Sequence, residues 1–185
     1  GEGAVSIGGF HEGVSLAALW KLPIVFICEN NEYSMGTPLS RTMSVEDVSM
    51  KALGYGIDRD RFFVEDVLDV EQRIGEAVQR ARELSLPTLV EVRTYRFRGH
   101  SMSDPAKYRS KEELEEYKEK DPIDHVLKTI LDNKWATEEQ VEQINEKIRQ
   151  EVEEAVQFAE ESPWPDDDEL YKDIYAEENY PYITD

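Results

Sequence analysis

Oxygen-bearing side chains stand at two places in the chain that a parallel sheet would bring together. A Gly-Glu-Gly turn occupies residues 1–3, and Asn31 follows an apolar run 29 residues after Glu2. In a βαβ unit, the turn after one strand and the end of the next strand lie side by side at the carboxyl edge of the sheet. We therefore expect Glu2, the side-chain amide of Asn31 and the main-chain carbonyl of Tyr33 to converge on one hard cation such as Mg²⁺, which binds oxygen ligands.

Neither half of this pattern is specific by itself. G-x-G turns occur in many nucleotide-binding folds and in plain tight turns, and Asn30-Asn31 is also typical of a turn after a strand. A dinucleotide-binding dehydrogenase is a further interpretation of GEGAVSIGG, but Gly8 and Gly9 fall at the wrong spacing for G-x-G-x-x-G. The spacing between Glu2 and Asn31 is what favours a metal site.

A second candidate segment is RGHSMSDPAKYRS, residues 98–110, which we call the 98–110 loop. It contains Gly, three Ser and Asp-Pro and shows no usable periodicity, so it predicts a loop of functional length. His100 lies within it, where it has no core to pack into. A solvated loop histidine is one interpretation of it, and a role in chemistry is implied only by the resemblance described below.

An alternation of helices and strands is expected to position these residues. Strand, helix, strand, helix and strand in short order predict the α/β class, a parallel sheet with crossover helices. The first strand is a continuous apolar run that favours a parallel strand covered on both faces. The expected elements are a helix at 10–21, a strand at 23–30, a helix at 45–53 capped by Ser44, a strand at 61–67, a helix at 70–84 and a strand at 88–97.

The remainder of the chain is predicted to be helical and acidic. Helices are expected at 111–118, 122–133 and 137–161, followed by an arm that packs on a neighbouring surface or is disordered. We therefore divide the chain into a partial α/β domain at 1–110, which includes the 98–110 loop, and a C-terminal helical extension with its arm at 111–185.

Composition excludes several classes of partner. The formal net charge is −20, and residues 111–185 carry −17 of it. This acidity argues against nucleic acid and against an anionic membrane surface, and no apolar run is long enough to span a bilayer. Cys28 is the single cysteine, so no intramolecular disulfide forms within this sequence, and a reducing compartment fits.

Two stretches of the sequence resemble one family. GEGA, FHE and AALWKLPIVFICENNEYSMGTP together resemble the thiamine-diphosphate motif, normally Gly-Asp-Gly ending in Asn-Asn, of the α subunits of two-oxoacid dehydrogenases. TYRFRGHSMSDPAKYRSKEELEEYKEKDPI resembles the regulatory-loop region of the pyruvate dehydrogenase α subunit. These segments and their order cover nearly the whole chain. The resemblance implies a thiamine-diphosphate-binding α/β fold, with thiamine diphosphate and Mg²⁺ held between an α and a β subunit.

The resemblance also implies roles for individual residues. Glu2 stands where the family has its metal-binding Asp, Asn31 supplies the amide ligand, and Tyr33 supplies the carbonyl ligand. The other implied residues are Gly1, Gly3 and Ala4 of the turn against the cofactor, Arg96 on the diphosphate, His100 as the catalytic and cofactor-contacting histidine, and Ser101 as a possible phosphorylation site. The sequence departs from the family pattern at Glu2, which is one methylene longer than Asp.

The implied activity is the oxidative decarboxylation of pyruvate and transfer of the acetyl group to lipoyl groups. The implied partners are the β subunit, the dihydrolipoyl acyltransferase core and the substrate pyruvate, with no nucleic acid and no membrane. Because the chain begins at the turn, we expect an upstream half to be missing, and we expect the 185-residue chain alone to be inactive. A cytoplasmic location of the bacterial type is expected, with the mitochondrial matrix as the alternative.

Two other functions stay open on the sequence. Branched-chain two-oxoacid and acetoin dehydrogenases have α subunits that differ in the 98–110 loop, so the substrate is not fixed by the motif. A truncated or divergent α-like domain could also keep the fold and a partner surface in a binding or structural role. A titration with the cofactor separates that role from an enzyme.

Overall fold

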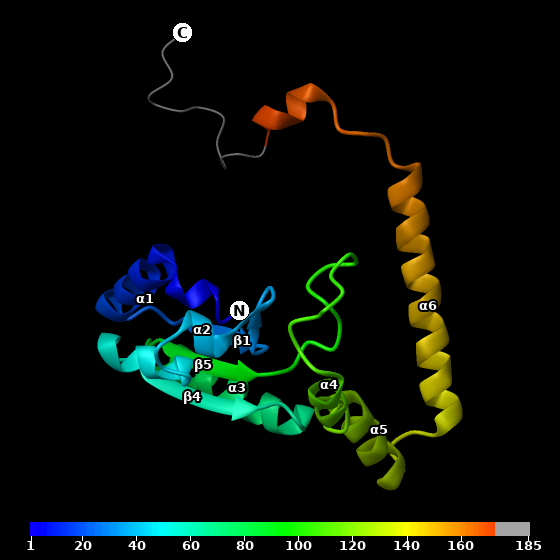
Figure 1. The fold of residues 1–185 in the computed structure, drawn as a ribbon, viewed down its shortest axis with the longest axis horizontal. Coiled ribbons are helices and arrows are strands. Elements are labelled where there is room, and N and C mark those ends of the chain that lie inside the picture. The colour runs from blue at the N-terminus through cyan, green and yellow to red at the C-terminus, as the bar shows by residue number, and fades with distance from the viewer. Residues whose placement is uncertain (173–185) are drawn as a thin grey trace. The chain divides into compact units, whose positions relative to one another are not determined.

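A parallel three-stranded sheet forms the centre of the first part of the chain (Figure 1). The computed structural model describes residues 1–172, and the chain divides into two compact units, Gly1–Asn133 and Lys134–Asp185. The strands are β1 (Val25–Asn30), β4 (Asp58–Phe63) and β5 (Thr88–Arg93), in the order β1-β5-β4. Both pairings are parallel. This arrangement confirms the predicted α/β class.

Helix α3 (Val67–Leu84) covers one face of the sheet. Its side chains at 70, 74, 77 and 81 recur at helical spacing, and Ala77 packs with Phe62, Val90 and Val92 in one core cluster. The side chain of Asp66 caps the helix by accepting from the Leu68 N–H at 2.9 Å. The predicted helix at 70–84 is therefore present and begins three residues earlier.

The opposite face carries a second core cluster. Val5, Cys28, Leu39 and Val48 pack together there, and Phe10 and Met43 cover them. These residues come from β1 and from four short elements, which are η1 (Ala4–Ser6), α1 (Gly8–Trp20), α2 (Leu39–Thr42) and η2 (Val48–Tyr55). Burial raises the pKa of the Cys28 thiol to about 11.

The helix expected at 45–53 is wrong in position and in type. The segment Val48–Tyr55 is a 3₁₀ helix, and neither Ser44 nor Asp47 caps it with its side chain. The Asp47 carboxylate instead accepts from Ser49 Oγ at 2.5 Å and from Arg59 Nη1 at 3.1 Å. The 3₁₀ helix begins at Val48, three residues later than the capping pattern predicts.

The expectation that the first strand is covered on both faces is met only in part. Cys28 and Asn30 are buried, but Ile27 on the α3 side is 50% exposed. Strand β1 has one neighbour in the described residues, β5, and α3 reaches Val25 in the core cluster without covering Ile27. The sequence also gave no signal for the short hairpin formed by β2 (Tyr33–Ser34) and β3 (Thr37–Pro38).

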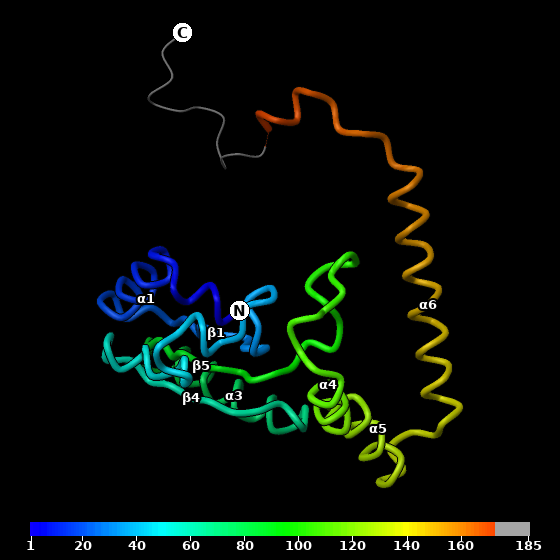
Figure 2. Tube along the Cα trace, viewed as in Figure 1, coloured from blue at the N-terminus to red at the C-terminus, as the bar shows by residue number. Residues whose placement is uncertain are grey.

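The chain leaves β5, passes through the 98–110 loop and enters α4 (Lys111–Lys118) and α5 (Pro122–Asp132) (Figure 2). Ser110 and Asp121 cap these helices with their side chains. The second unit contains α6 (Glu138–Glu161), which starts with a capping box between Thr137 and Gln140, and η3 (Asp167–Tyr171). The predicted arm lies largely outside the described residues. Within residues 1–172, no helix combines the length and apolarity of a bilayer span.

Candidate active site

The structure brings Glu2 and Asn31 into direct contact at the carboxyl end of β1. Glu2 is only 1% exposed, and its Oε2 accepts a hydrogen bond from the Asn31 N–H at 3.2 Å. The Asn31 side-chain oxygen accepts from the Tyr33 N–H at 3.2 Å, so the carboxamide is held within a tight turn. The buried carboxylate of Glu2 thus contacts the main chain of Asn31, and the Tyr33 N–H orients the side-chain oxygen of Asn31.

The glycine turn packs closely against the β2–β3 hairpin. A Cβ atom at Gly3 would lie 2.2 Å from the Ser34 Oγ and 2.9 Å from its Cβ, so only glycine permits this approach. The Ala4 N–H donates to the Gly1 carbonyl at 3.0 Å, which closes the turn as η1 begins. Gly1, Gly3 and Ala4 thus set the position from which Glu2 projects.

Tyr33 has a role that its sequence context did not indicate. The predicted contribution is its main-chain carbonyl, but its hydroxyl also donates to Glu113 Oε1 of α4 at 2.9 Å. Tyr95 donates to the same oxygen at 2.7 Å and stacks on Tyr117 with ring centroids 3.9 Å apart. Burial, with the Glu113 contact second, raises the pKa of Tyr33 to about 12. These contacts tie α4 to the ends of β1 and β5.

Arg96 and His100 approach one another beyond the end of β5. Arg96 Nη1 lies 3.4 Å from His100 Nδ1, and Arg96 Nη2 donates to the Met35 carbonyl and to the Tyr108 hydroxyl. Arg96 Nε is buried and has no partner within the described residues. The guanidinium is therefore fixed by the hairpin and the 98–110 loop while one of its donors stays unsatisfied.

Asp104 organises the 98–110 loop. Its carboxylate accepts from the His100 N–H at 2.7 Å, the Ala106 N–H at 2.8 Å and the Tyr108 hydroxyl at 2.9 Å. The hydrogen bond from the His100 N–H is the largest of the causes that lower the pKa of Asp104. The loop is irregular in its backbone, as predicted, and is braced by its own side chains. Ser101 is exposed, with its Oγ 3.1 Å from that of Ser103.

Acid is expected to loosen this loop. A carboxylate with a lowered pKa stabilises the loop above the ordinary Asp value of 3.8, and this contribution is lost as the pH falls through the lower pKa of the folded state. Amide NMR shifts of His100 and Ala106, followed from about pH 5 to about pH 2, should report the loss. Asp104→Asn should abolish this titration and Asp132→Asn should preserve it. A titration that survives Asp104→Asn would assign it to another group.

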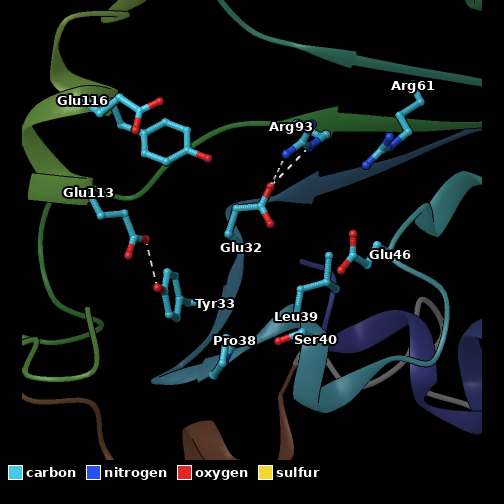
Figure 3. A pocket seen from close by; sticks show the side chains of 11 residues that line it. Glu32, Tyr33, Pro38, Leu39, Ser40, Glu46, Arg61, Arg93, Glu113 and Glu116 are labelled. Atoms are coloured by element: carbon cyan, nitrogen blue, oxygen red, sulfur yellow. Dashed lines mark hydrogen bonds and ion pairs between the residues drawn. The ribbon is translucent and has the colours of Figure 1, made fainter. Parts of the chain in front are cut away.

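A cavity at the end of the sheet does not coincide with these residues. It has a volume of about 420 Å³ and includes Tyr33 but not Glu2, Asn31, Arg96 or His100. Figure 3 shows Glu32 directed at Arg93 in its lining, where their side chains form an ion pair of 2.7 Å. The lining is Glu32, Tyr33, Pro38, Leu39, Ser40, Glu46, Arg61, Arg93, Glu113, Glu116 and Tyr117. The Glu32–Arg93 pair joins the turn after β1 to the end of β5, and the Tyr33 hydroxyl joins the cavity wall to Glu113 of α4.

The chemistry of the predicted residues fits a divalent cation that carries a diphosphate. A hard cation takes carboxylate, amide and main-chain oxygens, and Glu2 and Asn31, which carry the first two, are joined by a hydrogen bond through the Asn31 main chain. The Asn31 oxygen accepts one hydrogen bond and retains a second lone pair. Arg96 supplies an incompletely satisfied cation from the neighbouring strand end. The ligand roles of all these residues stay predictions.

A comparison with known protein families decides the affiliation. The sequence model of the dehydrogenase E1 component family matches residues 1–167. The chain belongs to this family. The E1 match includes both the glycine turn and the 98–110 loop, so the resemblance inferred from the motifs is confirmed.

Individual E1 relatives are similar over nearly all of this chain. It is 51% identical to the pyruvate dehydrogenase E1 component subunit alpha of Rickettsia felis over 95% of this chain and 54% of the relative. The subunit of the same name from Rhizobium meliloti is 44% identical over 94% of this chain and 50% of the relative. The one from Porphyra purpurea is 40% identical over 96% of this chain and 52% of the relative. The chain therefore spans about half the length of the curated E1 relatives it matches.

Sequence reasoning missed one polar group beside the E1 motif. Glu91 lies in the middle of β5 with no exposed area and accepts from Asn30 Nδ2 at 2.8 Å. A carboxylate within the apolar run TLVEV was the available signal, because a buried charge needs partners. Its partners come from three other elements and could not be read from spacing.

Proposed function

We propose that the chain is part of the decarboxylating component of a pyruvate dehydrogenase complex. This component oxidatively decarboxylates pyruvate and transfers the acetyl group to lipoyl groups of the dihydrolipoyl acyltransferase core. The observation that carries the proposal is the contact between buried Glu2 and Asn31 at the carboxyl edge of the sheet. The membership of the E1 family and the names of the relatives support the same activity.

The proposed cofactors are thiamine diphosphate and Mg²⁺. When bound, thiamine diphosphate supplies the carbanion chemistry by which a two-oxoacid loses CO₂. Glu2, Asn31 and the Tyr33 carbonyl would hold the cation, and Gly1, Gly3 and Ala4 would bring the turn against the diphosphate. Arg96 would add a charge-assisted contact to the diphosphate.

His100 and Ser101 are the residues of the 98–110 loop to which we assign roles. His100 would contact the reacting groups, because an imidazole can hold or release a proton near neutral pH. Phosphorylation of Ser101 would add close to two negative charges three residues from Asp104, and repulsion between them would disturb the hydrogen bonds that order the loop. A kinase acting on this loop would therefore switch the site off.

The proposed assembly is a heteromer with a β subunit, which in the resembling family supplies the glutamate that activates the cofactor. The Rickettsia and Rhizobium relatives are bacterial and support a cytoplasmic location. Pyruvate is proposed as the substrate over branched-chain two-oxoacids and acetoin because the relatives described above share the name pyruvate dehydrogenase.

An assembled-enzyme assay tests this function. The longer polypeptide that contains this chain is co-expressed with its β subunit and supplied with Mg²⁺ and thiamine diphosphate. We expect pyruvate to reduce a dye acceptor, and branched-chain two-oxoacids and acetoin to react far more slowly. The 185-residue chain without the β subunit is the control and should be inactive. If the assembled enzyme prefers another substrate, that substrate takes the place of pyruvate in the assignment. If it binds no cofactor, a structural role is favoured.

Shortening Glu2 is expected to tighten cofactor binding. The longer side chain reaches the Asn31 N–H at 3.2 Å, and Mg²⁺ tolerates an imperfect ligand geometry poorly. In the assembled enzyme, Glu2→Asp should withdraw the carboxylate from this N–H and improve Mg²⁺-thiamine diphosphate affinity about tenfold, or about 1.4 kcal/mol. Calorimetric titration of the cofactor at fixed Mg²⁺ measures the change. Weaker binding by the Asp variant would mean that the turn is matched to Glu.

A further inference from the structure

Glu91 is a buried carboxylate that accepts hydrogen bonds from three other elements. Its Oε1 accepts from Asn30 Nδ2 at 2.8 Å, and its Oε2 accepts from the Ser49 N–H at 3.0 Å and from Arg61 Nε at 3.1 Å. A carboxylate satisfies all three donors because both of its oxygens accept. The Arg61 guanidinium compensates the charge, which would otherwise be costly to bury.

Asn30 passes this constraint to the turn that follows β1. Asn30 has no exposed area, and because its Nδ2 is committed to Glu91, its Oδ1 faces the other way. That oxygen accepts from the Glu32 N–H at 3.0 Å. Glu32 has a φ of 71°, in the left-handed region that residues other than glycine rarely adopt. The hydrogen bond that the Glu32 N–H donates to Asn30 Oδ1 thus holds a strained residue in place.

Asn31 lies between these two residues. Its N–H donates to Glu2 Oε2 and its side-chain oxygen accepts from the Tyr33 N–H, both at 3.2 Å. The direction of the Asn31 amide is therefore set by the conformation of residues 30–33, which we call the strand-end turn. A change at Asn30 or Glu32 would alter this direction without removing any atom of Asn31.

We propose that Glu91 and Asn30 form a positioning pair that fixes the strand-end turn and so aims Asn31 at the Mg²⁺-diphosphate site. The inference rests on the proposed function for the identity of the ligand. The constraint on the turn itself rests only on the hydrogen bonds from Asn30 to Glu91 and from the Glu32 N–H to Asn30. Through Ser49 and Arg61, the pair also ties the turn to η2 and β4, so that three elements share one carboxylate.

A reciprocal exchange of the two side chains tests the pair. Asn30→Asp places a carboxylate against the Glu91 carboxylate. Glu91→Gln places an amide NH₂ against either Asn30 Nδ2 or the donors of Ser49 and Arg61. Rotating the Asn30 amide to relieve this clash would turn its NH₂ toward the Glu32 N–H. Neither single variant can therefore keep all the hydrogen bonds.

The double variant Asn30→Asp/Glu91→Gln can keep every one of them. The new amide NH₂ at position 91 donates to the new carboxylate at position 30, which still accepts from the Glu32 N–H. The amide oxygen at position 91 accepts from Ser49 and Arg61. The net charge of the pair is unchanged, so a rescue reports the hydrogen-bond pattern and not the charge.

The readout is hydrogen exchange of the Glu32 and Asn31 amides in the cofactor-free chain, measured by NMR. We expect each single variant to accelerate this exchange about tenfold or more, and the double variant to stay within about threefold of the parent. Asn145→Asp is the matched control, because Asn145 Nδ2 donates to Glu142 at 3.3 Å in an exposed pair, and it should change neither amide.

The outcomes test the role of the Glu91–Asn30 pair separately from the identity of the ligand. If the single variants fail to fold and the double variant folds, the pair is supported; if the double variant exchanges like the worse single variant, it is overturned. Cofactor affinity in the assembled enzyme should fall in both single variants and recover in the double variant. If the single variants exchange their Glu32 and Asn31 amides faster but bind the cofactor as tightly as the parent, the positioning role is overturned. An assembled parent enzyme that binds no cofactor would instead refute the proposed function and with it the ligand assigned to the turn.

Discussion

Replacing His100 by alanine is expected to slow acetyl transfer to lipoyl groups by about 100- to 10,000-fold, the usual contribution of a general acid or base. The imidazole stands exposed on the 98–110 loop, 3.4 Å from Arg96 Nη1, and its backbone N–H is held by Asp104. Its loss should therefore remove a proton carrier without disturbing the core. Steady-state kinetics of the assembled enzyme with pyruvate and a lipoyl-bearing domain measure the effect.

His125→Ala is the matched control for this experiment. The side chain of His125 is 52% exposed on α5, where its nearest acidic partner, Asp66, lies 3.8 Å away. The same substitution there should leave the kinetics close to those of the parent. Equal thermal stability of the two variants would show that the chain still folds. If His100→Ala keeps the kinetics of the parent, His100 is an exposed loop residue without a catalytic role.

Leu89→Ala is expected to destabilise the first unit by about 2–5 kcal/mol, the usual cost of removing a fully buried leucine side chain. Leu89 lies in the central strand β5 and has no exposed area. Because β4 and β1 flank it, little of the resulting cavity can collapse. Urea unfolding of both chains gives the difference in the free energy of unfolding.

Leu84→Ala provides the control for cavity formation. Leu84 ends α3 and is 56% exposed, so the same atoms are removed from a site that already contacts water. We expect a change below about 0.5 kcal/mol there, as for most surface substitutions. Equal losses at the two positions would show that the β5 core does not dominate the stability of this unit.

Local signals predicted most of the helices well. Ser110, Pro122 and Thr137 each stand at the start of a helix that begins within one residue of the predicted position. Caps and proline act through the nearest turn of the backbone, so their effect can be read from a few residues. Ser44 does not cap the 3₁₀ helix at Val48–Tyr55, and the Asp47 carboxylate bonds instead to Ser49 and to Arg59 of β4.

In the candidate site, too, some contacts follow from local patterns and others do not. The approach of Glu2 to Asn31 follows from the geometry of parallel strand ends, so spacing predicts it. The β2–β3 hairpin was missed because two-residue strands have no periodicity. The partners of Glu91 depend on the register that places Arg61 and Cys28 on either side of it. Such a register is fixed by the packed sheet and not by any local pattern.

The single thiol of the chain gives a direct way to observe this sheet opening. With a pKa of about 11, about one Cys28 thiol in ten thousand is ionised at pH 7, and burial shields it from reagents. Alkylation of the native chain must therefore wait for β1 to separate from the short helices that cover it. The rate at which Cys28 is alkylated therefore measures the rate of local unfolding around β1. Because Cys28 is the single cysteine of this sequence, the measurement needs neither an added probe nor the removal of another thiol.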